Sequence, residues 1–222
     1  MNHLSLREQT DQQIAKTRAA NPDFMGAVDE LLAEAKSFQR GAEAIDLAQK
    51  APDFELPNAR GELVALSDLL ACGPVVVTFY RGGWCPYCNL QLQAMQTRLP
   101  ELRELGASLV AISPQKPDAS LSDEEKQELS FSVLSDQDAK TAASYGVAWE
   151  VPERLLSHMR DDRGLDLESI NDGNASILPI PATFVLDAEG VVRWRFVDVD
   201  YRTRAEPQDI VEAVQQLSEN AG

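Results

Sequence analysis

Residues 74–89 read PVVVTFYRGGWCPYCN, and this stretch decides how the chain folds. It opens with a run of β-branched and aromatic residues, 74–80, as expected of a strand buried on both faces. Cys85 and Cys88 follow at once, just before a helical pattern. Three interpretations compete for the pair: a dithiol that exchanges disulfides, a peroxide-reducing cysteine with its helper, or half of a zinc site.

The residues after the pair complete a strand–helix–strand unit. Apolar residues at helical spacing predict a helix that ends near Gly106; they are Leu92, Met95, Leu99, Leu102 and Leu105. Pro100 lies inside this pattern and is expected to kink or break the helix. The run SLVAIS (108–113) predicts a second buried strand, parallel to the first because a helix connects the two.

The position of the cysteines at a strand-to-helix junction favours redox chemistry. Unpaired N–H groups and the helix dipole stabilise a thiolate near a helix N-terminus. Pro86 suits the first turn, since a proline has no N–H to lose there. A zinc site needs two further ligands, and Cys72, His3 and His158 show no matching spacing, so no metal is expected.

Composition limits the compartment and the partners. The chain has 222 residues and a formal charge of −16 at pH 7, which disfavours nucleic acid and anionic membrane surfaces as partners. No apolar run approaches the ~18 residues of a membrane span, and no secretion signal is visible at the start. An odd count of 3 cysteines without an export signal favours a reducing, cytoplasmic location. No cofactor is implied.

The pattern divides the chain into a helical extension, residues 1–50, and a main domain, residues 51–222. FSVLSD (131–136) predicts a third strand, and ATFVLDAEGVVRWRFVD (182–198) predicts a hairpin. Residues 147–180 are a polar, weakly patterned insertion. If this insertion covers the cysteines, it would affect the choice of substrate.

One apolar stripe runs along the extension. Asn21 and Pro22 predict a helix cap and a first-turn proline. Apolar residues then recur at alternating steps of four and three; they are Phe24, Val28, Leu31, Ala35, Phe38, Ala42 and Ile45. We favour packing of this stripe on the chain's own domain over a homodimer contact through residues 24–45, because glycines interrupt the pattern.

Four segments together resemble a known family. APDFELP, VVVTFYRGGWCPYC, FSVLSD and PATFVLDAEG are similar to the alkyl hydroperoxide reductase / thiol-specific antioxidant family, the peroxiredoxins. The likeness runs from about Ala51 to Leu217 and is strongest to a peroxiredoxin-like branch with a thioredoxin-style Cys-x-x-Cys. The resemblance implies an α/β, thioredoxin-like fold, in which helices flank a central mixed β-sheet.

The chain departs from the active-site pattern of the family that it resembles. That pattern is P-x-x-x-[TS]-x-x-C, with an arginine from a later strand. Here Cys88 takes the peroxidatic position, Cys85 the Thr/Ser position and Arg81 the proline position. Pro181 replaces the later arginine and resembles the cis-proline that faces the dithiol in thioredoxins. Trp84 matches the Trp-Cys pair of thioredoxins.

The resemblance leaves two orders of reaction open. By analogy with thioredoxins Cys85 attacks first, whereas by analogy with peroxiredoxins Cys88 does so and becomes a sulfenic acid. Both routes end in a Cys85–Cys88 disulfide that an external thiol reduces. We favour Cys85 at this point, because the Thr and Arg that would support Cys88 are replaced, with Arg81 as partial compensation.

The resemblance therefore implies a thiol-dependent antioxidant oxidoreductase that reduces peroxides and is recycled by thioredoxin or glutathione. The alternatives are a reductase of protein or glutathione disulfides and, in another class, a non-catalytic redox sensor. Cys72 is expected to be a small buried thiol rather than a third redox partner. The segment DVDYRTRAEP (198–207) resembles what the family branch carries after its last strand, and it is interpreted as a solvated loop with charge pairs or as a partner contact.

Overall fold

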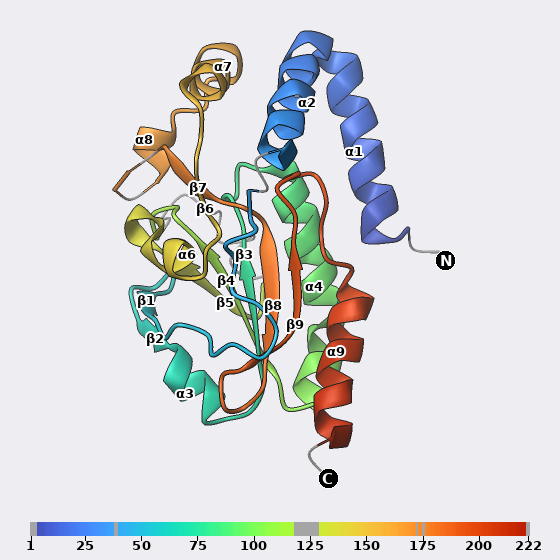
Figure 1. Ribbon diagram of the computed structural model, residues 1–222, viewed down its shortest axis with the longest axis vertical. Helices are drawn as coiled ribbons and strands as arrows, with labels where there is room; N and C mark the ends of the chain where they lie inside the picture. Colours follow the sequence, from blue (N-terminus) through green and yellow to red (C-terminus); the bar gives the residue numbers. More distant parts are fainter. Residues whose placement is uncertain (1–3, 38–39, 118–128, 172, 175, 221–222) are drawn as a thin grey trace.

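The computed structural model describes residues 4–37, 40–117, 129–171, 173–174 and 176–220. A mixed sheet lies at its centre (Figure 1). The strands are β3 (Val75–Phe79), β4 (Ser108–Ser113), β5 (Ser132–Ser135), β8 (Ala182–Leu186) and β9 (Val192–Val197). Their order is β5-β4-β3-β8-β9; β3, β4 and β5 are parallel neighbours, whereas β8 pairs antiparallel with both β3 and β9. The predicted strands and the mixed sheet are confirmed.

Strand β3 lies in the middle of the sheet because both of its faces are apolar. All of its residues are buried. Side chains alternate across a strand, so Val75, Val77 and Phe79 join one core cluster while Val76 joins another on the opposite face. The cysteine segment is therefore anchored to the most deeply buried strand of the protein's sheet.

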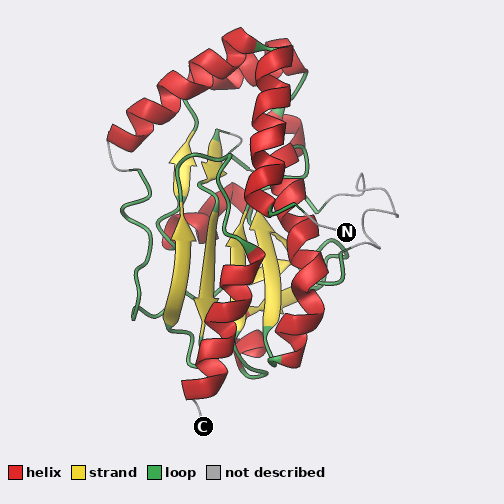
Figure 2. Ribbon diagram, turned by 90° about the vertical axis from the view of Figure 1, so that its right-hand side faces the viewer, coloured by secondary structure: helices red, strands yellow, loops and turns green. Residues whose placement is uncertain are grey.

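Helices α4 (Pro86–Glu104) and α9 (Pro207–Asn220) cover one face of the sheet (Figure 2). The expectation that Pro100 breaks the helix is wrong, since α4 continues past it. Pro100 itself is exposed, whereas Leu99 and Leu102 on either side of it are buried in the core. Their packing holds both halves in one helix and offsets the ~3 kcal/mol that an interior proline costs.

Shorter elements lie on the other side of the sheet (Figure 1). They are the hairpin of β1 (Glu55–Pro57) and β2 (Leu63–Ala65), α3 (Leu66–Leu70), the 3-10 turn η1 (Gln137–Ala139) and α6 (Lys140–Ser144). Tyr145, directly after α6, is fully buried, and its ring lies 5.0 Å from Phe79 and 5.5 Å from Phe184. These rings tie the short elements to β3 and β8.

The N-terminal extension forms two helices, α1 (Leu6–Ala20) and α2 (Pro22–Ser37) (Figure 1). The Asn21 side chain accepts a hydrogen bond from the Phe24 N–H at 3.0 Å, which confirms the predicted cap. Helix α1 packs against α4. The α2 residues Phe24, Met25, Val28 and Leu32 belong to the main core cluster, so the stripe packs on the chain's own domain.

The helix of the extension is shorter than the apolar stripe predicted. Helix α2 ends at Ser37, and Ala42 and Ile45 lie in an irregular segment that leads to the main domain. Phe38 lies outside the described residues. Gly41 has a φ of 89°, which is far from helical values and turns the chain away from the helix axis.

The insertion at residues 147–180 contains regular structure. Its elements are β6 (Ala148–Glu150), α7 (Glu153–Arg163), α8 (Leu167–Ile170) and β7 (Ile177–Pro179). Strands β6 and β7 form an antiparallel pair of their own, and Leu155 and Met159 of α7 join the main core cluster. Among the helices of the described residues, none is long and apolar enough to span a membrane.

Candidate active site

The two cysteines lie at the N-terminus of α4, six residues beyond the end of β3. Cys85 is the N-cap residue, Pro86 is the first residue of the helix, and Cys88 lies in the first turn. The N–H groups of Cys88 and Asn89 donate to the Cys85 carbonyl oxygen at 3.0 and 3.1 Å. The predicted placement is confirmed, and it puts both sulfurs beside the positive end of the helix dipole.

The turn between β3 and α4 requires glycine. Gly82 has a φ of 139°, and a Cβ there would come within 2.4 Å of Trp84 Nε1. The Gly83 N–H donates to Gln115 Oε1 at 2.7 Å, and its carbonyl oxygen accepts from Asn89 Nδ2 at 2.8 Å. These contacts fix the turn that directs the cysteines back toward the sheet.

The two thiols are buried and have opposite acid–base character. Cys85 is 1% exposed and Cys88 is 0% exposed. Burial raises the pKa of Cys88, but a hydrogen bond from Cys85 and the positive charges of Arg204 and Arg81 outweigh it, so the pKa is lowered well below 9.0. Burial, the hydrogen bond with Cys88 and the charge of Cys88 together raise the pKa of Cys85 well above 9.0. The favoured state is a Cys88 thiolate that accepts a hydrogen bond from the Cys85 thiol, the reverse of the order that we favoured from sequence.

Arg204 places a guanidinium beside Cys88, although Pro181 replaces the later arginine of the family pattern. Its NH2 lies 3.2 Å from the Cys88 sulfur, and the side chain is buried. Arg204 lies in the irregular segment between β9 and α9, inside the DVDYRTRAEP segment, so the interpretation of that segment as merely solvated is wrong. The only signal in the sequence was the likeness of this segment to the family branch.

Arg81 is the second cation of the site. It is buried, and its guanidinium carbon lies 4.8 Å from the Trp84 ring and 4.1 Å from the Tyr201 ring. Within the part of the chain that the structure describes, neither Arg81 nor Arg204 forms an ion pair with a carboxylate. Two buried positive charges therefore lie near the cysteine pair, and both lower the pKa of Cys88 in a poorly solvated setting.

Two expectations about other residues are wrong. The Ile180–Pro181 bond is trans, as are all peptide bonds between described residues, so Pro181 is not a cis-proline. Most X-Pro bonds in folded proteins are trans, and Pro181 leads directly into β8, where its carbonyl oxygen accepts from the Asp198 N–H at 3.4 Å. Cys72 is exposed, because it lies in the turn after α3 rather than in a strand.

Helix α7 of the insertion lies near Cys85. A cavity of about 30 Å³ lies beside Cys85, and its wall includes Trp84, Tyr201 and the α7 residues Leu155 and Met159. A space of this size holds about one water molecule. In this conformation only a small molecule fits beside the sulfur.

The cysteine pair lies at the start of a helix that follows a central strand, and this strand is parallel to one neighbour and antiparallel to the other. This arrangement defines a thiol protein of the thioredoxin-like fold. The sequence model of the AhpC/TSA family matches residues 47–195, more than half of the chain. The chain therefore belongs to the AhpC/TSA family, as the resemblance implied.

Curated relatives of the chain are peroxiredoxins. The chain is 35% identical over 97 residues to "Peroxiredoxin Bcp" of Escherichia coli K12, an alignment that covers 44% of this chain and 62% of the relative. It is 29% identical over 159 residues to "Putative peroxiredoxin bcp" of Coxiella burnetii, an alignment that covers 71% of this chain and 93% of that relative. The chain thus spans less than two thirds of the length of the first of these relatives.

Solved structures of peroxiredoxins share the fold. The crystal structure of peroxidoxin BcpB from Mycobacterium tuberculosis superposes with a TM-score of 0.60 at 22% identity, over 78% of this chain and 98% of that one. A mutant of the peroxiredoxin 6 of Arenicola marina gives a TM-score of 0.61 at 16% identity, over 80% of this chain and 75% of that one. The thioredoxin-like α/β fold is confirmed.

Proposed function

We propose that this protein is a thiol-dependent antioxidant oxidoreductase that reduces peroxides through Cys88 and Cys85. The observation that carries the proposal is the contact between the Cys88 sulfur and the Arg204 guanidinium, 3.2 Å apart. The pKa of Cys88 is lowered in this setting. The thiolate is the nucleophilic form of cysteine. Positive groups around it also stabilise the charge that develops on the peroxide oxygens in the transition state.

In the proposed cycle the Cys88 thiolate attacks one oxygen of a hydroperoxide, ROOH. A sulfur–oxygen bond forms, the oxygen–oxygen bond breaks, and RO⁻ takes up a proton and leaves as ROH. Cys88 is thereby oxidised to a sulfenic acid. Cys85 then loses its proton and attacks the Cys88 sulfur, so that a disulfide forms and water leaves. The two thiols supply the two electrons that reduce the peroxide.

The cycle closes when an external thiol reduces the Cys85–Cys88 disulfide. We propose thioredoxin or glutathione for this step, because both supply reducing equivalents in a cytoplasmic compartment, where cysteines are kept reduced.

Exchange of protein or glutathione disulfides is the second candidate. The CPYC sequence with Cys85 at the N-cap of α4 favours it, because a thiolate at that position would attack a disulfide. The burial and the raised pKa of Cys85 oppose it. A redox sensor would use the same pair without turnover.

We propose that residues 1–50 are part of the same folded unit as the thioredoxin-like domain, residues 51–222. The buried α2 residues that would have formed a homodimer contact pack against this chain's own core instead. We therefore propose no dimer through residues 24–45.

Stopped-flow oxidation of the reduced protein by hydrogen peroxide and by oxidised glutathione separates the candidates. We expect fast reaction with peroxide that is lost in Cys88→Ser and persists for one turnover in Cys85→Ser. Cys72→Ser is the matched control and should react like the wild-type protein. Fast exchange with oxidised glutathione that is lost only in Cys85→Ser would support the second candidate. If the protein reacts with both oxidants no faster than free cysteine does, both enzymatic candidates are excluded and the redox sensor is favoured.

A further inference from the structure

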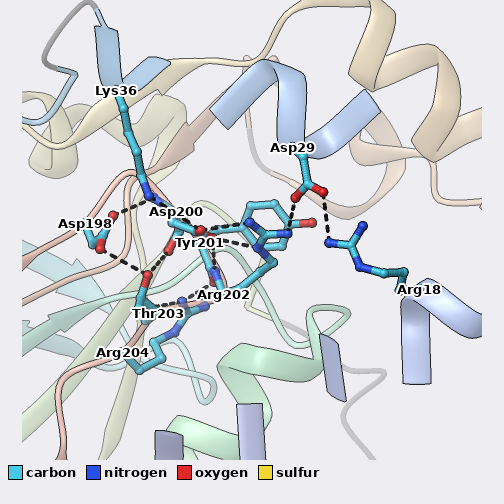
Figure 3. A network of polar contacts seen from close by, with 9 residues as sticks. All are labelled: Arg18, Asp29, Lys36, Asp198, Asp200, Tyr201, Arg202, Thr203 and Arg204. Carbon is cyan, nitrogen blue, oxygen red and sulfur yellow. Dashed lines mark hydrogen bonds and ion pairs between the residues drawn. The ribbon is translucent and has the colours of Figure 1, made fainter. Parts of the chain in front are cut away.

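A network of charged side chains ties the loop at residues 198–204 to the N-terminal helices (Figure 3). Arg202 donates to both carboxylate oxygens of Asp200, at 2.8 and 2.9 Å. Its remaining terminal nitrogen donates to Asp29 of α2 at 2.7 Å. Asp29 also accepts from Arg18 of α1 at 2.8 Å. One guanidinium thus joins the loop to the extension.

Arg202 is the buried centre of this network. Its side chain is 11% exposed and that of Asp200 is 15% exposed, whereas the Arg18 side chain is 47% exposed. Charged hydrogen bonds with bidentate geometry and partial burial are stronger than exposed ion pairs, which contribute little. Lys36 of α2, 3.8 Å from Asp200, adds a second and weaker link. The hold of the extension on the loop therefore depends chiefly on Arg202.

The same loop orients both cations of the site. Arg204 NH1 donates to the carbonyl oxygens of Tyr201 and, at 2.7 Å, of Thr203, while its NH2 lies against the Cys88 sulfur. The Tyr201 ring covers the Arg81 guanidinium from 4.1 Å. A displacement of the loop would therefore move both positive charges relative to the sulfur.

We propose that Arg202 and Asp29 are positioning residues through which the N-terminal helices hold Arg204 against Cys88 and Arg81 under the Tyr201 ring. Neither of them touches the Cys88 sulfur in the contacts of the described residues, and each acts through the loop. The inference rests on the proposed function for its kinetic readout. It also predicts a change in Cys88 ionisation that needs no substrate.

The test measures the ionisation of Cys88 in the full chain. In a Cys72→Ser, Cys85→Ser background Cys88 is the sole thiol, and the ultraviolet absorbance of its thiolate against pH gives a midpoint. We expect Arg202→Gln to raise this midpoint by about 1. In the chain with its native cysteines, Arg202→Gln should slow the reaction with hydrogen peroxide about tenfold.

A second pair of variants keeps Arg202 in place. Like Arg202→Gln, Asp29→Asn should raise the midpoint and slow the reaction with hydrogen peroxide. Both effects should be smaller, because Arg202 keeps its contacts with Asp200. Asp29→Glu keeps the negative charge and should recover part of the loss. Failure of Asp29→Glu to recover any of it would overturn the role of the Asp29 carboxylate.

Arg195→Gln is the matched control. Arg195 also ties the sheet to the N-terminal part of the chain, through the carbonyl oxygens of Ala44 and Ile45 and an ion pair with Asp46 at 3.2 Å. It should lower the melting temperature and leave the midpoint and the rate within twofold of the wild-type values.

Three outcomes decide between the inference and the proposed function. Equal midpoint shifts in Arg202→Gln and Arg195→Gln would reduce the network to a stabilising role and overturn the inference. An unchanged midpoint in Arg202→Gln, with a wild-type protein that reacts fast with peroxide, would overturn the inference alone. A wild-type protein that does not react with peroxide while Arg202→Gln shifts the midpoint would overturn the proposed function alone.

Discussion

The cysteine segment at residues 81–89 and the loop at residues 198–204 hold the same sulfur in different ways. The segment is shaped by close neighbours: a glycine turn, a helix N-terminus and short hydrogen bonds. The loop brings Arg204 from 116 positions further along the chain and is bound to Asp29, 173 positions before Arg202. In the cycle that we propose, the local segment would supply the nucleophile and the distant loop the charge that makes it reactive. A motif therefore defines the reacting atom but only part of its environment.

Removing the positive charge of Arg204 from the loop should have the largest effect on the reaction with peroxide. Arg204→Gln keeps a hydrogen-bond donor near Cys88 and loses the positive charge, so we expect the reaction with hydrogen peroxide to slow about 100-fold. The pKa of Cys88 should rise toward its ordinary value, because one of the cations that lower it is gone. Stopped-flow kinetics and thiolate absorbance measure the two effects.

Arg193→Gln is the control for this variant, since it removes a positive charge from the β8–β9 hairpin, where Arg193 pairs with Asp187 at 2.6 Å. It should leave the peroxide rate unchanged. A change of less than threefold in Arg204→Gln would mean that the segment alone activates Cys88.

A substitution in the glycine turn of the cysteine segment should have the next largest effect, on the stability of the fold. Gly82→Ala puts a Cβ within 2.4 Å of Trp84 Nε1 at a φ of 139°, which only glycine adopts readily. We expect the free energy of unfolding, measured by urea denaturation, to fall by about 2 kcal/mol. Gly26→Ala is the control, because a Cβ there meets nothing within 4 Å and alanine suits a helix. Equal stability of Gly82→Ala and the wild-type protein would contradict the strained turn.

Acid should reduce the contribution of the loop to the stability of the fold, by less than Gly82→Ala reduces the free energy of unfolding. Burial raises the pKa of Asp200, but the hydrogen bonds and charge of Arg202 outweigh it, and the pKa lies below 3.8. A depressed carboxyl pKa stabilises the fold above the unfolded-state value, and this stabilisation is lost as pH falls through the folded-state value. We expect the free energy of unfolding to fall below about pH 4 by about 1 kcal/mol more in the wild-type protein than in Asp200→Asn. Parallel curves for the two proteins would show that the Asp200 carboxylate does not stabilise the fold.

Cys72 lies outside both regions and should show the smallest effect. Its Sγ lies 3.6 Å from the Asp68 carbonyl oxygen, a long contact, and the residue is exposed. Cys72→Ser should leave the free energy of unfolding within about 0.5 kcal/mol and the peroxide rate unchanged. A slower rate of recycling by thioredoxin or glutathione in this variant would instead give Cys72 a role in the cycle.

The sequence predicted those parts of the protein that depend on neighbours in the chain. The strand–helix–strand unit and the 182–198 hairpin follow from residue periodicity and turn residues, and Cys85 was correctly placed at a helix start. Pro100 was misjudged because the burial of the leucines beside it, a tertiary effect, outweighs the local preference. Arg204 was missed because no pattern in residues 198–207 reveals a contact with Cys88.

The separation of the three thiols has a practical consequence for labelling. Cys72 is exposed, whereas Cys85 and Cys88 are buried, and Cys85 lies beside a space of only about 30 Å³ that α7 helps to line. A bulky alkylating reagent should therefore add a single adduct to the native, reduced protein and reach the other two thiols only after denaturation. Mass spectrometry of such adducts would count Cys72 and say nothing about the oxidation state of the buried pair. An assay of this protein by surface thiol labelling would follow the one cysteine that lies outside the site.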